Sequence, residues 1–181
     1  LSPGALQIVQ GPSEYFGFRT LRGMTKAGIG VGIPKEEIIA VGHYVDHELL
    51  VNLESDTQKR ISRIDKKEPR RILISIGGAG AQQDLLVNIV KFLWNKIKEG
   101  TVILFINFGD HTKALEYFKR QIPKFEPNLQ LHNNWEDTCK FIEKTINEQP
   151  PQSLHGFLHN NTYSAVYTTN LLMRASDFMM T

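Results

Sequence analysis

The sequence predicts an α/β domain built on a doubly wound parallel sheet, and two features of its later part predict it. Short apolar runs alternate with longer segments in which apolar residues recur every three or four positions. Continuous apolar runs are typical of parallel strands covered on both faces, and the longer period is that of an amphipathic helix. The helical segments are short enough to be single crossovers, which favours an open sheet over a barrel.

Five segments have the composition of strands in such a sheet. The first is a continuous apolar run from Ile72 to Ile76, and the second is the run TVILFI at residues 101–106. Three shorter segments follow at Asn128–His132, Leu154–Leu158 and Asp177–Thr181.

Four helices are expected between these strands. The first is closed by Gly100, and its apolar residues recur at helical spacing: Leu85, Leu86, Ile89, Val90, Leu93, Trp94 and Ile97. The second ends at Pro123 and turns Leu115, Phe118 and Ile122 inward. The third runs from Trp135 to Ile146. The fourth, Tyr163–Arg174, is expected to turn Ala165, Val166, Thr169, Leu172 and Met173 inward.

The first 70 residues are less regular. Ile38–Val41 is expected to form a short strand, and one helix is expected from about Asp46 to Ile64. We interpret residues 1–35 as a connecting, interdomain segment and residues 36–181 as the Rossmann-like domain. Because the chain lacks an initiating Met and stops just as a predicted strand ends, we expect a fragment truncated at both ends, with the Rossmann-like domain truncated at its carboxyl terminus.

Composition limits the classes of partner. The net charge of +2 gives no general case for nucleic acid, so no nucleic-acid partner is expected. Seven Lys or Arg lie between Lys59 and Arg71 against two acids, which indicates a solvated helix end or a peripheral contact with an anionic membrane surface. The single cysteine and the absence of a signal peptide or of a membrane-spanning apolar run predict a cytoplasmic protein, with membrane association left open.

The segment RILISIGGAGAQ, residues 71–82, runs from a predicted strand into three glycines before a helix. Backbone amides and the helix dipole favour an anion there, and glycines let a phosphate approach closely. A Walker loop is excluded because Ala81-Gln82-Gln83 supplies no Lys-Ser/Thr pair. A dinucleotide fingerprint lacks its third small residue at Gln83, although Asp110 could serve as its ribose acid. A glycine turn without a ligand is the third interpretation.

Ligands of doubly wound sheets bind beyond the carboxyl ends of the strands, which directs attention to the loops at 77–81, 107–111, 133–134 and 159–161. Other chemistries have less support. The pairs His43–His47 and His155–His159 are each four residues apart, but there is no HExxH motif and no cysteine partner, so no metal site is expected. No Gly-x-Ser-x-Gly elbow is present, which removes a simple hydrolase.

Four short motifs follow one another along the chain. They are Ile33-Pro34 with Ile39–Gly42, Gly77-Gly78-Ala79-Gly80, Gly109–Leu115 and Ala175–Thr181. In this order they resemble the carboxyl-terminal half of GT-B glycosyltransferases, in particular the group with the peptidoglycan N-acetylglucosaminyltransferase and plant galactolipid synthases. The resemblance covers nearly the whole chain.

The resemblance implies an enzyme whose donor is a nucleotide sugar, most often a UDP-sugar, bound on this half. It implies no cofactor and no metal, and it assigns the acceptor and the catalytic base to a half that this chain lacks. The isolated chain is therefore expected to bind weakly without turnover, and a lipid-linked acceptor is left open. Glycine-loop residues Gly77, Gly78, Ala79 and Gly80, with the loop-tip residues Asn107, Gly109, His159 and Asn160, form the candidate donor site.

Two other functions stay open. One is a NAD-type dinucleotide-binding oxidoreductase domain, for which Asp110 is the discriminating residue. The other is a non-catalytic Rossmann-like binding domain. The segment Gly42–His47, GHYVDH, favours the latter, because the resembling enzymes commonly have Pro-x-Arg after this strand.

Overall fold

The computed structural model describes residues 5–20, 32–76 and 83–180. The chain divides into two compact units, Leu1–Asp46 and His47–Thr181. The boundary expected from the sequence, between residues 35 and 36, lies before this division and stays a prediction.

The first unit is a small parallel strand pair with one helix. Its elements are β1 (Gln7–Val9), α1 (Pro12–Thr20), the 3₁₀ turn η1 (Lys35–Glu37) and β2 (Ile38–Ala40). The expected short strand at Ile38–Val41 is thus present as β2, whereas β1 was not expected. Val9, Ile33 and Ile38 form its buried core.

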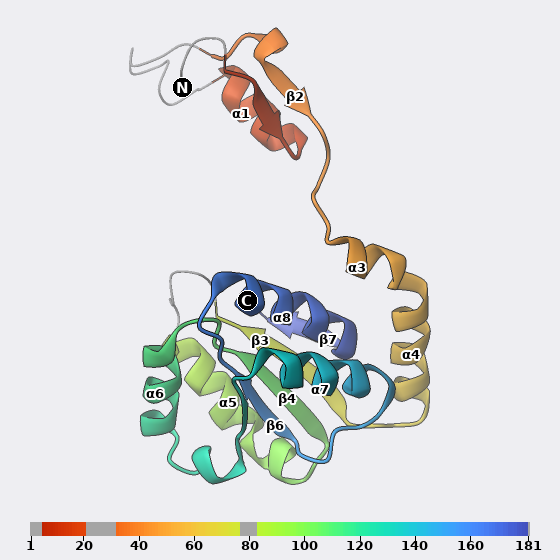
Figure 1. Ribbon diagram of the computed structural model, residues 1–181, viewed down its shortest axis with the longest axis vertical. Coiled ribbons are helices and arrows are strands. Elements are labelled where there is room, and N and C mark those ends of the chain that lie inside the picture. The colour runs from red at the N-terminus through yellow and green to blue at the C-terminus, as the bar shows by residue number, and fades with distance from the viewer. Residues whose placement is uncertain (1–4, 21–31, 77–82, 181) are drawn as a thin grey trace. The chain divides into compact units, whose positions relative to one another are not determined.

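The second unit is a five-stranded, wholly parallel sheet with helices on both faces (Figure 1). Its strands are β3 (Arg70–Ser75), β4 (Val102–Asn107), β5 (Gln130–His132), β6 (Leu154–Phe157) and β7 (Phe178–Met180). The crossover helices are α5 (Gln83–Lys98), α6 (Thr112–Gln121), α7 (Trp135–Asn147) and α8 (Thr162–Ala175). The predicted α/β, doubly wound, Rossmann-like sheet is confirmed.

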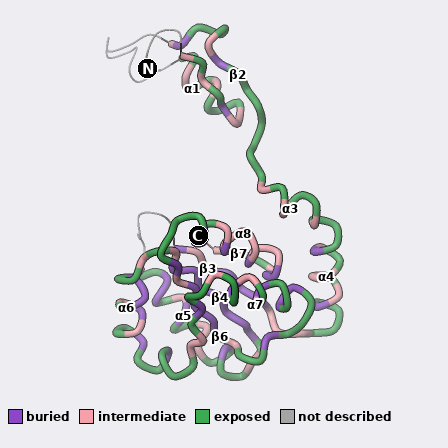
Figure 2. Tube along the Cα trace, viewed as in Figure 1, coloured by how far each residue is buried: buried purple, intermediate pink, exposed green. Residues whose placement is uncertain are grey.

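The period of two along the strands divides the core into two layers. Ile72, Ile74 and Ile76 pack with α5 and α6, whereas Leu73 packs on the other face with residues of α7 and α8. Strands β3 and β4 are buried over nearly their whole length (Figure 2). This two-sided burial explains why the sequence shows continuous apolar runs here rather than alternation.

The order of the strands in the sheet is β5-β6-β4-β3-β7. In the common dinucleotide-binding order the fourth strand lies beside the first. Here the fourth strand of the unit, β6, lies between β4 and β5. The chain leaves β4 toward α6 on one face and leaves β6 toward α8 on the other, so these neighbouring strands form a topological switch point.

The prediction of a single helix from Asp46 to Ile64 is wrong. The structure has two helices, α3 (His47–Val51) and α4 (Leu53–Asp65), separated at Asn52. The Asn52 amide donates to the carbonyl of Glu48 at 2.8 Å, so its side chain competes with the helical bond pattern. Arg174 of α8 then holds both helices, since its guanidinium lies 2.8 Å from Glu48 and 2.9 Å from Asp56.

The arginines of the basic segment, residues 59–71, mostly make contacts within the fold. Arg63 and Arg71 are 5% and 2% exposed, and Arg60 donates to the carbonyls of Met173 and Ser176. Asp177 accepts from Arg63 at 2.8 Å and from the Arg71 amide at 2.8 Å. These arginines connect α4 and β3 to the residues just before β7. Fewer of the positive charges of the segment are therefore available to an anionic partner than the sequence suggested. A membrane contact stays a prediction.

Candidate functional site

The candidate site lies at the carboxyl ends of β4 and β6, which we call the carboxyl edge of the sheet. Backbone hydrogen bonds join the loops that follow these two strands. The Phe108 amide donates to the carbonyl of Phe157 at 2.8 Å, and the His159 amide donates to the carbonyl of Gly109 at 2.8 Å. Gly109 has φ of +62°, a conformation that glycine adopts at little cost. The sheet therefore continues past the strand ends and fixes both loop tips at the switch point.

Asn107 holds this edge to α8. Its amide nitrogen donates to the carbonyl of Ala165 at 2.8 Å and to the Thr169 hydroxyl at 2.7 Å, while its oxygen accepts from the Gly109 amide at 3.0 Å. The residue is 2% exposed, so these bonds occupy its side chain within the protein. The geometry gives Asn107 a positioning role. The predicted contact with a donor stays a prediction.

His159 is the buried ionisable group at the switch point. It is 3% exposed, and its Nε2 atom has no hydrogen-bond partner among the described residues. The ring of Trp135 is half-buried and lies edge-on to it, with centroids 5.6 Å apart. Burial lowers the pKa of His159, so the neutral imidazole predominates at neutral pH. A buried polar atom without a partner costs free energy, which a polar ligand reaching Nε2 would recover.

The amino terminus of α8 follows His159 directly. Asn161 caps it by accepting from the Ser164 amide at 2.8 Å. The predicted residue Asn160 is exposed beside it, and Tyr163 in the first turn is 90% exposed. The positive end of a helix dipole and an open aromatic ring are thus adjacent to the switch point.

Charge at the other loop is mixed. The Asp110 carboxylate lies 3.7 Å from His111 Nδ1, and both side chains are partly exposed. The first turn of α7, which starts from the neighbouring β5, carries Glu136 and Asp137. The edge therefore has fewer cations than a polyphosphate site built on lysine and arginine.

Four of the eight predicted site residues, Asn107, Gly109, His159 and Asn160, come together at this edge. The glycine-loop positions Gly77, Gly78, Ala79 and Gly80 lie outside the described residues, and their role stays a prediction.

Sequence reasoning missed four side chains of this region. The hydroxyls of Ser75 and Thr169 lie 3.2 Å apart and continue the network of Asn107 from β4 to the end of β3. Trp135 covers His159, and Tyr163 is exposed at the start of α8. Ser75 could have been found as the polar residue that ends an apolar strand, but Tyr163 gives no signal without knowing its exposure.

His132 and His155 do not join the site. His155 lies in the sheet rather than at its edge, with its Nδ1 3.2 Å from Nε2 of His132 and its Nε2 3.0 Å from the carbonyl of Gln152. Across the described ranges, no three His, Cys, Asp or Glu side chains gather closely enough to hold a metal ion. Among the helices that the structure describes, none combines the length and apolar character that a bilayer crossing demands.

Comparison with known proteins identifies a family without an assigned activity. No curated protein and no solved structure matches the chain. A family model described as "Domain of unknown function (DUF6938)" matches residues 33–181, which include β2 and the whole second unit. The chain belongs to the DUF6938 family.

Proposed function

We propose that the carboxyl edge between β4 and β6 binds a nucleotide sugar, with a UDP-sugar as the expected ligand. The observation that supports this most is the coincidence of the topological switch point with a buried histidine whose Nε2 lacks a partner among the described residues. Doubly wound sheets take their ligands at such points. The nature of the ligand comes from the resemblance of the sequence motifs to the donor-binding half of GT-B glycosyltransferases.

The roles of the residues follow from their positions. Tyr163, with its ring exposed, stacks on the base. The amino terminus of α8 faces the diphosphate, because helix amides and the helix dipole favour an anion there. His159, beside the ring of Trp135, offers its imidazole nitrogen to a polar group of the ligand. Asn107 keeps the loop of β4 in register with α8.

Glycosyl transfer also requires an acceptor and a base. The resemblance assigns the base and the acceptor to a half that this chain lacks, so we assign them to a partner domain or chain. The full reaction would proceed by holding the donor so that its anomeric carbon faces the acceptor. The 181-residue chain is expected to bind the donor and to turn nothing over.

Calorimetry of the 181-residue chain with UDP, UDP-N-acetylglucosamine, UDP-galactose, GDP and NAD tests the proposal. Uridine nucleotides are expected to bind with micromolar to millimolar dissociation constants and to bind more tightly than GDP. Binding of NAD alone would instead support the dinucleotide-binding interpretation, for which Asp110 is the candidate ribose acid. Absence of binding by all five ligands would favour a non-catalytic domain and contradict the proposal.

Replacing Tyr163 by alanine is expected to weaken UDP binding about tenfold, because stacking of a base on an aromatic ring contributes about 1–3 kcal/mol. The side chain is 90% exposed, so the midpoint of thermal unfolding should not move. Phe92→Ala is the matched control, since Phe92 is 83% exposed on α5 and lies outside the candidate site. Equal affinities of wild type and Tyr163→Ala would remove Tyr163 from the site.

A further inference from the structure

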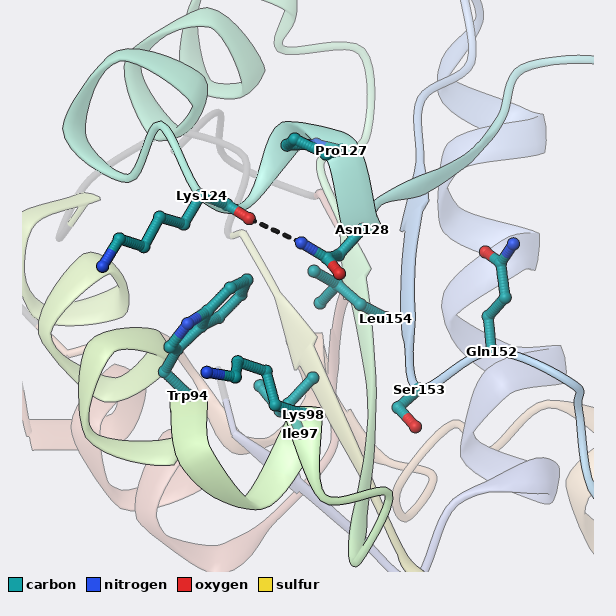
Figure 3. A pocket seen from close by; sticks show the side chains of 9 residues that line it. All are labelled: Trp94, Ile97, Lys98, Lys124, Pro127, Asn128, Gln152, Ser153 and Leu154. Atoms are coloured by element: carbon teal, nitrogen blue, oxygen red, sulfur yellow. Dashed lines mark hydrogen bonds between the residues drawn. The ribbon is translucent and has the colours of Figure 1, made fainter.

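A pocket lies at the amino ends of the strands, away from the switch point. It has a volume of about 750 Å³ and lies between the end of α5, the turn η2 (Glu126–Asn128) and the start of β6 (Figure 3). Its lining residues are Trp94, Ile97, Lys98, Lys124, Pro127, Asn128, Gln152, Ser153 and Leu154. Leu154 begins β6, whereas His159 follows its end, so this amino-edge pocket is separate from the switch point.

One wall of the amino-edge pocket combines an aromatic ring with two cations. Trp94, Lys98 and Lys124 lie together on one side of it (Figure 3). Both lysines are exposed, and neither ammonium group lies within ion-pair distance of a carboxylate among the described residues. The adjacent acid Glu126 is taken by Lys119, whose Nζ is 2.8 Å away. The two ammonium groups of this wall therefore have no ion-pair partner among the described residues.

The rest of the lining is suited to a small, partly polar ligand. Ile97 and Leu154 are buried and give an apolar base. Gln152 and Ser153 lie on the side facing Trp94 (Figure 3). The amide nitrogen of Asn128 donates to the carbonyl of Lys124 at 2.8 Å, which fixes the side chain and leaves its oxygen as an acceptor toward the pocket.

We propose that the amino-edge pocket binds a small molecule that carries both a planar ring and a phosphate group, as an aryl phosphate does. The ring stacks on Trp94, and the phosphate lies between the ammonium groups of Lys98 and Lys124. Ring stacking and charge pairing each contribute modestly at an exposed site, so both are needed for useful affinity. This proposal is independent of ligand binding at the switch point.

Tryptophan fluorescence distinguishes binding at the amino-edge pocket from binding at the switch point. The chain has two tryptophans, so Trp135→Phe leaves Trp94 as the reporter of the amino-edge pocket. Phenyl phosphate added to this 181-residue variant is expected to change the Trp94 emission with a saturable, millimolar dissociation constant. Lys98→Ala and Lys124→Ala in the same background should each weaken binding about fivefold. Lys91→Ala, an exposed lysine of α5 outside the pocket, is the matched control and should leave the affinity unchanged.

Competition decides which part of the ligand is recognised. Inorganic phosphate and benzyl alcohol should each displace phenyl phosphate with an inhibition constant at least tenfold above the dissociation constant of phenyl phosphate itself. Equal competition by inorganic phosphate would reduce the pocket to a simple anion site and overturn the proposal. It is also overturned if phenyl phosphate produces no saturable change, or if Lys91→Ala weakens binding as much as Lys98→Ala.

Discussion

Replacing Asp177 by alanine is expected to lower the free energy of unfolding by about 3–5 kcal/mol. The carboxylate accepts from Arg63 at 2.8 Å and from the Arg71 amide at 2.8 Å, and its side chain is 8% exposed. Removing it leaves the buried Arg63 guanidinium without its counter-charge. Urea denaturation at pH 7 measures the loss.

The matched control is Asp65→Ala, which removes an exposed acid from the end of α4 in the same basic segment. It should change the free energy of unfolding by less than about 0.5 kcal/mol. Asp177→Asn keeps an acceptor but loses the charge, so it should fall between the two. An Asp177→Ala protein as stable as Asp65→Ala would show that the ion pair does not hold β7 to the sheet.

Lowering the pH from 6.5 to 4 is expected to destabilise the second unit steeply. Burial lowers the pKa values of His132 and His155 from 6.5 to about 4 each. The unfolded chain therefore binds protons in this window that the folded chain does not, so stability is present above pH 6.5 and is lost as the pH falls. The loss is on the order of 3 kcal/mol for each imidazole at pH 4.

The double variant His132→Phe, His155→Phe isolates this contribution from that of the carboxylates. The two rings lie among Phe105, Phe141 and Phe157, so phenyl groups suit the surroundings and no imidazole nitrogen is left unpaired. Its unfolding free energy should fall less between pH 6.5 and 4 than that of wild type, whereas His47→Gln, at an exposed position, should retain the wild-type slope. Parallel profiles for wild type and the double variant would contradict the account.

Most of the second unit could be predicted because its apolar pattern is unambiguous. The ends of α5 and α6 follow from Gly100 and Pro123, and every predicted strand from Ile72 onward is present within a few residues. The pattern failed on α8, where the predicted inward residue Val166 is 56% exposed and Thr168 is fully buried instead. Small and polar residues line the buried face of this helix, so its orientation depends on tertiary contacts that hydrophobicity does not report.

The strand order could not be read from the sequence. Periodicity distinguishes strands from helices but does not say that β6 inserts between β4 and β5. This insertion places the switch point between β4 and β6. His159 and Asn160 are therefore stronger candidates for ligand contacts than the sequence indicated, because the sequence drew attention to the glycine motif after β3. The pairing of Asp177 with Arg63 is equally invisible, because it joins residues 114 positions apart.

The central claim is that a uridine nucleotide binds at the switch point beside His159. Nitrogen-15 magnetic resonance of the histidine-labelled chain, titrated with UDP, tests it most directly because it observes the imidazole nitrogens. We expect the Nε2 resonance of His159 to shift in a saturable manner while those of His132 and His155, within the sheet, stay in place. Saturable UDP binding with an unchanged His159 resonance would place the ligand elsewhere and contradict the claim.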